Sequence, residues 1–363
     1  MRADPILKGI IISLLLVGFF VLASASVGIT ASMGLSPYYF ILRQLVVGGL
    51  VGFILFFIAY RISYKRWRSW ALPIFIASAL LTAAVLVPGV GLSAGGASRW
   101  LSLGTFSFQP SEFLKFGFIL YLAAWFSSGK RKISSVSGGL VPFLFIIGVP
   151  SALLILQPDI GTLGVIAFSG LFLFLIGGGK FSHLIILIVI GLLVLAALIY
   201  VVPGGEYRRD RIDVFLNPDH NPQGEGYQVR QALIAIGSGG IFGRGFGMSR
   251  QKFQYLPEPM GDSIFAVAAE EFGFIGSAVI IALFAAFAWR GFRASRFSPD
   301  AFGKLLGSGI VVLVVVQSMI NIAALSGLAP LTGIPLNFIS HGGSALAMTL
   351  FEMGVLLNIS RMR

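Results

Sequence analysis

Apolar runs long enough to cross a membrane recur along almost the whole chain. Ten stretches of about 18–23 residues, a length that spans the hydrocarbon core of a bilayer, lie near residues 7–28, 38–60, 70–88, 111–127, 138–156, 160–177, 183–202, 263–289, 304–325 and 343–359. With 56% apolar and 11% charged residues, the chain has too few charges for the surface of a soluble protein. The sequence therefore predicts an all-α integral membrane protein, with residues 1–363 forming a single polytopic domain of about ten transmembrane helices.

The distribution of Lys and Arg orients this bundle. On one side of the membrane, sixteen basic residues share the termini and connections with only Asp4 and Asp300. These basic residues are Arg2, Lys8, Arg61, Lys65, Arg66, Arg68, Lys130, Arg131, Lys132, Lys180, Arg290, Arg293, Arg296, Lys304, Arg361 and Arg363. Because basic residues accumulate on the cytoplasmic side, both termini are predicted to be cytoplasmic. The net charge of +12 is then an orientation signal and does not indicate nucleic-acid binding.

The segment at about 203–262, between the seventh and eighth predicted helices, is the longest polar stretch. It carries seven basic and seven acidic residues and is predicted to be a large extracytoplasmic loop. Three shorter segments, Gly89–Ser111, Gln157–Asp159 and Ser326–Ser344, meet the same side. Ionisable groups at membrane depth are unfavourable unless they serve a function or pair inside the bundle, so we expect a functional site on this side.

The composition excludes several other kinds of site. The chain has no cysteine, which removes disulfides, thiol catalysis and cysteine-based metal sites, and its three histidines are scattered. The glycine run between Gly237 and Gly247 does not fit a nucleotide-binding loop, because Phe242 stands where that motif needs glycine. We expect tight turns or a re-entrant segment there instead.

Asp262 is the strongest candidate for chemistry. It follows the Pro-rich stretch 257–261 and precedes an apolar helix. One interpretation is a helix N-cap, whose negative charge the helix dipole would stabilise. The other is a general base, for which position matters before pKa. Glu258 offers a second carboxylate nearby, so a divalent cation (Mg²⁺ or Mn²⁺) between the two is a further hypothesis.

Two basic residues could face a phosphate group. The segment Gln109–Glu112 opens the fourth span, with Ser111 as the expected N-cap. Lys115 lies three residues after Glu112, so both occupy one helix face and are expected to pair. Arg99 is either an interface anchor or a cation directed at a phosphate.

Three further acidic residues are expected to have structural or partner-coupled roles. Asp159 follows a Gln-Pro turn and is expected to cap the next helix. Glu270 and Glu271 lie two turns inside a predicted membrane helix. At that depth at least one of them should pair with a buried base or hydrogen-bond donor.

Motifs along almost the whole chain, in order, resemble the SEDS family (shape, elongation, division and sporulation). These motifs are Gly96–Trp100, Gln109–Lys115, Gln157–Thr162, Gly226–Gln228, Ile234–Gly240, Tyr255–Glu258, Ala269–Glu271, Thr332–Leu336, Ser340 and Gly342–Ser344. Residues 247–253 are more similar to the FtsW branch, which acts in division, than to the RodA branch, which acts in elongation. The chain departs from the family pattern at Met260-Gly261, where His-Thr is usual, and at Ser263, Asn337 and His341.

The resemblance implies a ten-helix peptidoglycan glycosyltransferase that polymerises lipid II at the outer face of the bacterial cytoplasmic (inner) membrane, for septal wall synthesis. It also implies a class B penicillin-binding protein as the partner transpeptidase, together with other divisome or elongasome membrane proteins. The essential loop aspartate of the family falls on Asp262, which is therefore the predicted catalytic residue. The predicted substrate-binding residues are Arg99, Gln109, Glu112, Lys115, Glu258 and Ser340, with Arg99 and Lys115 facing the pyrophosphate.

Three other functions stay open at this point. The chain could be a transporter that flips lipid II, an elongation polymerase of the RodA type, or a scaffold that only activates a partner. The polar groups cluster on the outer side and no inverted repeat is evident, which favours catalysis over transport.

Overall fold

A computed structural model of the chain describes residues 3–36, 38–94, 97–104, 106–129, 133–202, 205–217 and 220–361. Several residues used in the sequence analysis lie outside this description. They are Arg2, Gly96, Lys130, Arg131, Lys132, the start of the long loop at 203–204, Asp219 and Arg363.

Helices occupy all ten predicted spans. They are α1 (Pro5–Ser32), the continuous run of α2 (Tyr39–Arg43), the π-helix η1 (Gln44–Leu50) and α3 (Val51–Arg61), α4 (Tyr64–Ala84), α5 (Pro110–Phe126), the π-helix η2 (Val136–Leu140) with α6 (Val141–Leu156), α7 (Ile160–Ile176), α8 (Phe181–Tyr200), α11 (Ile264–Arg296), α12 (Ala301–Leu325) and α13 (Gly343–Arg361). Within the described residues, eight of these segments are long and apolar enough to cross a membrane. The other two, α5 and α7, have 17 residues each, at the short end of the spanning range of about 17–25. The predicted helical membrane bundle is confirmed.

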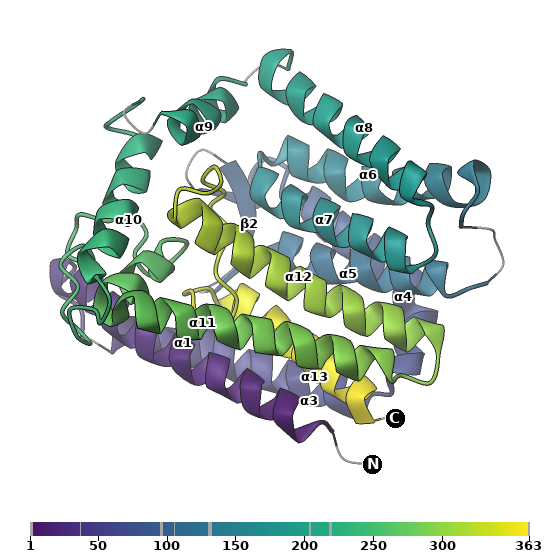
Figure 1. The fold of residues 1–363 in the computed structure, drawn as a ribbon, viewed down its shortest axis with the longest axis horizontal. Coiled ribbons are helices and arrows are strands. Elements are labelled where there is room, and N and C mark those ends of the chain that lie inside the picture. The colour runs from purple at the N-terminus through teal and green to yellow at the C-terminus, as the bar shows by residue number, and fades with distance from the viewer. Residues whose placement is uncertain are drawn as a thin grey trace.

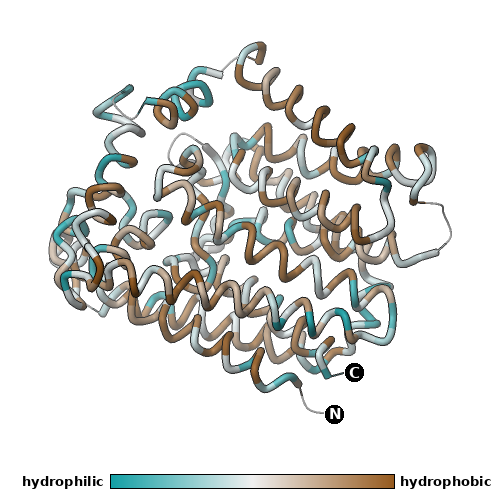
Figure 2. Tube along the Cα trace, in the orientation of Figure 1, coloured by the Kyte–Doolittle hydropathy of each residue, from teal (hydrophilic) through white to brown (hydrophobic). Residues whose placement is uncertain are grey.

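The two termini lie at one end of the bundle and the long polar loop lies at the other (Figure 1). This loop contains two helices, α9 (Glu206–Leu216) and α10 (Glu225–Gly239). Polar residues gather on α9, whereas the long helices are mostly apolar (Figure 2). Large apolar side chains such as Phe145 on α6 and Phe168 on α7 are exposed, as expected where lipid tails are the surrounding medium.

A small antiparallel sheet precedes α5 and was not predicted from the sequence. Its strands are β1 (Gly91–Ala94), β2 (Ala97–Leu103) and β3 (Phe106–Phe108), in the order β1-β2-β3. Strands of four, seven and three residues are too short to carry a clear alternation of apolar and polar positions. The sheet lies in the external segment 89–111 and leads directly into α5.

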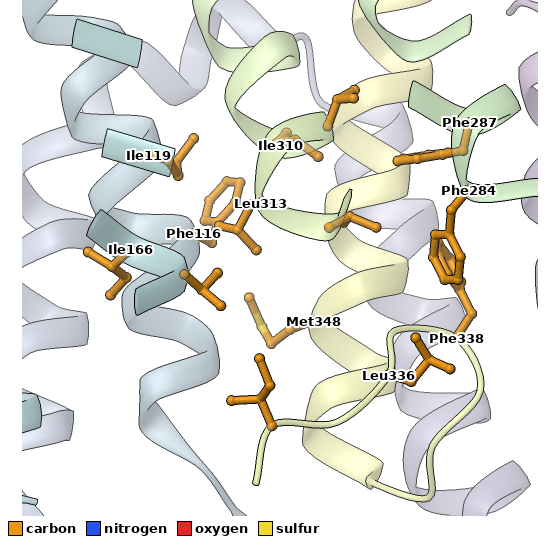
Figure 3. Packing of buried hydrophobic residues seen from close by; sticks show 14 of the residues in the cluster. Phe116, Ile119, Ile166, Phe284, Phe287, Ile310, Leu313, Leu336, Phe338 and Met348 are labelled. Carbon is orange, nitrogen blue, oxygen red and sulfur yellow. The ribbon is translucent and has the colours of Figure 1, made fainter. Parts of the chain in front are cut away.

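The connection between α12 and α13 returns into the bundle. Its residues Leu336 and Phe338 are buried, and the Phe338 ring lies 6.4 Å from the ring of Phe284 and 6.2 Å from that of Phe287. Figure 3 shows these aromatic rings of α11 around the connection, at one side of the packed core. Residues 336–340 of the connection 326–342 are therefore held inside the bundle, where they can position the segment that enters α11.

α11 is interrupted one third of the way along, at Gly273 (φ +66°, ψ −161°). The segment 240–245 pairs with the interruption: the N–H of Phe274 donates to Gly240 O at 2.8 Å, and the N–H of Gly245 donates to Glu271 O at 3.0 Å. A Cβ at Gly243 would lie 2.1 Å from Glu271 O, so only glycine fits there. Because lipid offers no hydrogen bonds, the freed backbone groups need this internal pairing. The glycine run thus serves backbone packing against α11.

Candidate active site

Asp262 immediately precedes α11 but does not cap it. The N-cap of α11 is Ser263, and no side chain there accepts a helix N–H. The Asp262 carboxylate instead faces α10, where Gln228 Nε2 donates to its Oδ1 at 3.4 Å and to Ser263 Oγ at 3.0 Å. The N-cap interpretation of Asp262 is therefore wrong, and among the described residues the one side chain that donates to the carboxylate is that of Gln228.

The surroundings of Asp262 favour its protonated form more than water does. Burial raises the pKa of its carboxyl to about 6, and the neighbouring Glu258 carboxylate adds to the rise. The hydrogen bond from Gln228 and the positive charge of Arg211 oppose this rise in pKa. A carboxylate with a pKa near 6 is still mostly ionised at pH 7 and is a stronger base than an ordinary aspartate, as general-base catalysis requires.

Glu258 is exposed and has a left-handed backbone (φ +47°). Its carbonyl oxygen accepts from Gly261 N at 2.9 Å and Ser263 N at 3.2 Å, which closes a turn between the two carboxylates. Among the described residues, no group of three or more His, Cys, Asp or Glu side chains could hold a metal ion. A divalent cation beside Glu258 and Asp262 would therefore need oxygen ligands from a phosphate-bearing substrate, a mode common for Mg²⁺.

The connection 326–342 holds the backbone that precedes Asp262. The N–H of His341 donates to Met260 O at 2.8 Å, and Ser340 Oγ donates to Gly261 O at 2.7 Å. The same hydroxyl accepts from Leu336 N at 2.8 Å. Ser340, predicted to bind substrate, is thus buried and its hydroxyl bridges two backbone segments.

Arg211 is a candidate that sequence reasoning counted only as one of seven basic loop residues. It lies on α9 close enough to Asp262 to lower the pKa of that carboxyl. It also lines a cavity of about 80 Å³ with apolar residues of α9 and α10, such as Val214 and Val229, and with Pro330 of the connection. The spacing of Arg208 and Arg211, three apart on a short helix, was the available signal. Arg208 itself donates to Leu198 O at 2.8 Å at the end of α8.

Glu112 and Lys115 form the expected pair, but inside the bundle. Lys115 Nζ lies 2.8 Å from Glu112 Oε1, and both side chains are almost fully buried. Lys115 also donates to Gln317 Oε1 of α12, whose Nε2 donates to Pro335 O at 3.0 Å. Within the described residues, no hydrogen bond or ion pair joins Lys115 to Asp262. Gln109, and not the expected Ser111, is the N-cap of α5, and its backbone N–H donates to Ser344 Oγ at 3.4 Å.

Arg99 and Asp159 meet at the turn between α6 and α7. Arg99 donates from β2 to the carbonyl oxygens of Gln157 and Pro158. Asp159 is the N-cap of α7, and its Oδ1 accepts from Thr162 N at 3.2 Å. Arg99 thus fixes the sheet against this turn, and Asp159 caps α7 as the capping interpretation predicts.

Glu270 and Glu271 anchor the segment 247–252 to α11. Glu271 Oε1 lies 2.8 Å from Lys252 Nζ and accepts from Ser24 Oγ of α1 at 2.6 Å. Glu270 accepts from Ser249 Oγ at 2.6 Å. Both carboxylates are buried, and these partners come from α1 and from the long loop. This arrangement gives them a structural role, joining α1, α11 and the long loop.

Comparison with known proteins identifies the family. A model of the FtsW, RodA and SpoVE cell cycle proteins matches residues 6–363. The chain belongs to this family. Stage V sporulation protein E of Bacillus subtilis (strain 168) is 40% identical over 362 residues, covering 99% of this chain and 98% of that protein. A probable peptidoglycan glycosyltransferase FtsW of Trichlorobacter lovleyi is 38% identical over 358 residues, covering 98% of this chain and 93% of that protein.

Solved structures share the fold of this family member over nearly its whole length. A chain from work described as "Structural coordination of polymerization and crosslinking by a peptidoglycan synthase complex" matches with a TM-score of 0.82 at 29% identity, covering 99% of this chain and 98% of that chain. The rod shape determining protein RodA of Thermus thermophilus matches with a TM-score of 0.73 at 28% identity, covering 99% and 97%. The SEDS resemblance is therefore confirmed, and the chain is a multi-pass protein of the inner membrane.

Proposed function

We propose that this chain is a peptidoglycan glycosyltransferase that polymerises lipid II at the outer face of the cytoplasmic membrane. Its family membership supports this function, and the observation that carries it is the setting of Asp262. The carboxylate lies at the loop end of the bundle, caps no helix, and has its pKa raised to about 6. A membrane enzyme whose substrate has a lipid tail and a water-soluble sugar needs a base at this level.

The reaction requires one proton transfer and one departing group. A sugar hydroxyl of one chain attacks the anomeric carbon of a sugar linked to polyprenyl pyrophosphate. A carbon–oxygen bond forms, and the bond to the pyrophosphate breaks with its electron pair leaving on the phosphate oxygen. Asp262 accepts the hydroxyl proton, a contribution worth typically about 10²–10⁴ in rate.

The departing pyrophosphate needs positive charge close to this base. We infer this role for Arg211 because its charge lowers the pKa of Asp262 and because a guanidinium suits phosphate geometry. Lys115 is already paired with Glu112 and Gln317 in the core, so we assign it to support of the connection 326–342. Glu258 and Asp262 are the residues that would hold a Mg²⁺ or Mn²⁺ ion, and such an ion would supply further charge stabilisation.

The proposed partner is a class B penicillin-binding protein that cross-links the strands as they form. The structural match to a chain of a peptidoglycan synthase complex supports this pairing. Relatives named FtsW and stage V sporulation protein E, at 38% and 40% identity, support a role in septal wall synthesis over the RodA type of elongation. Other division proteins of the membrane would bind the same assembly.

The test is polymerisation of purified lipid II by the chain in lipid nanodiscs, with and without its partner transpeptidase. Wild type should form glycan strands that a gel resolves, whereas Asp262→Asn should form none while remaining folded and bound to its partner. Strand formation by a folded Asp262→Asn variant at the wild-type rate would rule out Asp262 as the base. Transfer of lipid II across a vesicle wall with no strands from wild type would instead indicate a flippase.

A further inference from the structure

Three consecutive carbonyl groups at the entrance to α11 are each held by a different residue of α12 or the connection 326–342. Met260 O accepts from His341 N at 2.8 Å, and Gly261 O accepts from Ser340 Oγ at 2.7 Å. Asp262 O accepts from Nδ2 of Asn321, on α12, at 2.7 Å. The third contact acts directly on the residue that carries the proposed base.

Asn321 makes this contact while one of its own polar atoms stays unsatisfied within the described residues. It is 3% exposed, and its Nδ2 lies between two carbonyls, because Ile334 O also accepts from it at 2.8 Å. Its Oδ1 is buried and has no hydrogen-bond partner among the residues that the structure describes. Turning the amide over would place that oxygen against both carbonyl oxygens, so the orientation is fixed. A buried unsatisfied acceptor is unfavourable and needs an explanation.

We propose that Asn321 is a positioning residue for the glycosyltransferase reaction, which fixes the peptide group after Asp262 and so aims the carboxylate at the substrate. This inference rests on the proposed function. The Asn321 amide joins Asp262 to Ile334 of the connection 326–342. The proposed base and this connection therefore keep one relative position. The two hydrogen bonds that Asn321 Nδ2 donates explain why the unsatisfied Oδ1 is tolerated.

The preceding turn of α12 also holds the connection 326–342. Gln317, four residues before Asn321 and on the same helix face, accepts from Lys115 and donates to Pro335 O at 3.0 Å. The buried Glu112–Lys115 pair thus reaches the connection 326–342 through Gln317, one residue from the Ile334 carbonyl that Asn321 holds. This places the pair behind the site as a support.

Asn358 provides a matched control. It is also a buried asparagine, 2% exposed, on α13. Its Nδ2 donates to Tyr60 O at 2.7 Å and its Oδ1 accepts from Tyr64 N at 2.9 Å. It therefore bridges two backbone segments as Asn321 does. It lies, however, at the end of the bundle that carries the two termini, away from the long loop (Figure 1). Loss of Asn358 reports the structural effect of removing such a bridge.

The experiment compares Asn321→Leu and Asn358→Leu with wild type, each with its partner transpeptidase in nanodiscs. Thermal unfolding, the folded fraction, kcat and KM for lipid II are measured. We expect Asn321→Leu to lose about 10–100-fold in kcat, because small misplacements of a catalytic group have effects of this size, with KM changed less than about threefold. Asn358→Leu should unfold at a lower temperature but keep kcat per folded molecule within about twofold.

The pH dependence of kcat separates a positioning role from a purely structural one, because a purely structural role of Asn321 would leave the acid limb in place. The groups that act on the Asp262 carboxyl are Glu258, Arg211 and Gln228, with burial as the largest influence. A carboxylate released by Asn321→Leu should gain water, so the acid limb of kcat should move to lower pH, and Asn358→Leu should leave it in place. If Asn321→Leu is poorly folded, Asn321→Ser, too short to reach both carbonyls, is judged by the same criteria.

Equal losses of kcat in the Asn321 and Asn358 variants would overturn the proposal, as would wild-type kcat in Asn321→Leu or an unmoved acid limb. These results require that wild type polymerises lipid II. A wild-type chain that forms no strands would count against the proposed function itself, so the two failures are distinguishable.

Discussion

Asp4 and Asp262 both precede a long membrane helix, at opposite ends of the bundle, and their surroundings differ sharply. Asp4 caps α1 by accepting from Ile6 N and Leu7 N at 3.0 Å each, and both of its oxygens accept from Arg290, at 2.9 and 2.7 Å. Within the part of the chain that the structure describes, Gln228 is the one side chain that donates to Asp262, at 3.4 Å, and a second carboxylate lies nearby. The first carboxylate has a structural partner on each oxygen, and we propose that the second, with fewer such partners, meets the substrate.

The other two aspartates that precede membrane helices are N-caps, as Asp4 is. Asp159 caps α7. Asp300 caps α12 and also accepts from the hydroxyl of Tyr64 at 2.7 Å. Asp4, Asp159 and Asp300 thus each accept a hydrogen bond from a backbone N–H in the first turn of their helix. Such a cap stabilises both the helix and the carboxylate, whereas Asp262 lies one residue before the cap position and makes no such bond.

The largest expected effect is on catalysis, through Asp262→Asn. The change keeps the shape of the side chain and removes its basicity, so polymerisation should fall by at least about 10²-fold. The variant should be as stable as wild type at pH 7 or more so, because a raised pKa means that ionised Asp262 opposes folding. This advantage should vanish below the ordinary aspartate pKa of 3.8, where the group is protonated in both states. Unfolding scans at pH 7 and below pH 3.8 check both parts.

The matching change at the other end, Asp4→Asn, should act on stability and not on chemistry. Asparagine still caps a helix, so the variant isolates the loss of the ion pair with the buried Arg290. Leaving one member of a buried pair alone typically costs about 3–5 kcal/mol, and the unfolding temperature should fall. The rate per folded molecule should stay near the wild-type rate. An equal loss of rate per folded molecule in both variants would contradict the division between structural and catalytic aspartates.

The sequence predicts the helices of this fold much better than the positions of its loops. Span positions follow from hydropathy because lipid forces every span to be an apolar helix, and the Glu112–Lys115 pair follows from local spacing. The interruption at Gly273 could not be predicted, since its hydrogen bonds come from residues about thirty positions earlier. The approach of Arg211 to Asp262 depends on how α9 packs, and no local pattern encodes that distance. The sequence also could not show that α11 begins one residue later than expected, with Ser263 and not Asp262 as its N-cap.

A smaller effect is expected from Arg211→Gln. Removing a cation that stabilises a departing pyrophosphate should lower kcat/KM by about 10–100-fold, somewhat less than the loss of a central oxyanion donor. Arg208→Gln on the same helix is the matched control, because Arg208 bonds the end of α8 at Leu198 O and should affect stability more than rate. Initial rates at subsaturating lipid II, with folded fractions measured in parallel, decide between them. Equal rates in the two variants would remove Arg211 from the site.

The smallest and sharpest effect is on the pH dependence of polymerisation. Because Asp262 must be ionised to act as a base, the rate should fall below its pKa of about 6, by about tenfold per pH unit. Glu258 raises the pKa of Asp262 and Arg211 lowers it. The acid limb should therefore move to lower pH in Glu258→Gln and to higher pH in Arg211→Gln, while Asp4→Asn leaves it unmoved. Opposite shifts from two neighbours of one carboxylate would be difficult to produce by a general loss of stability, which changes the amplitude of the profile and not the position of its limb. Shifts in the same direction, or none, would mean that another group supplies the base.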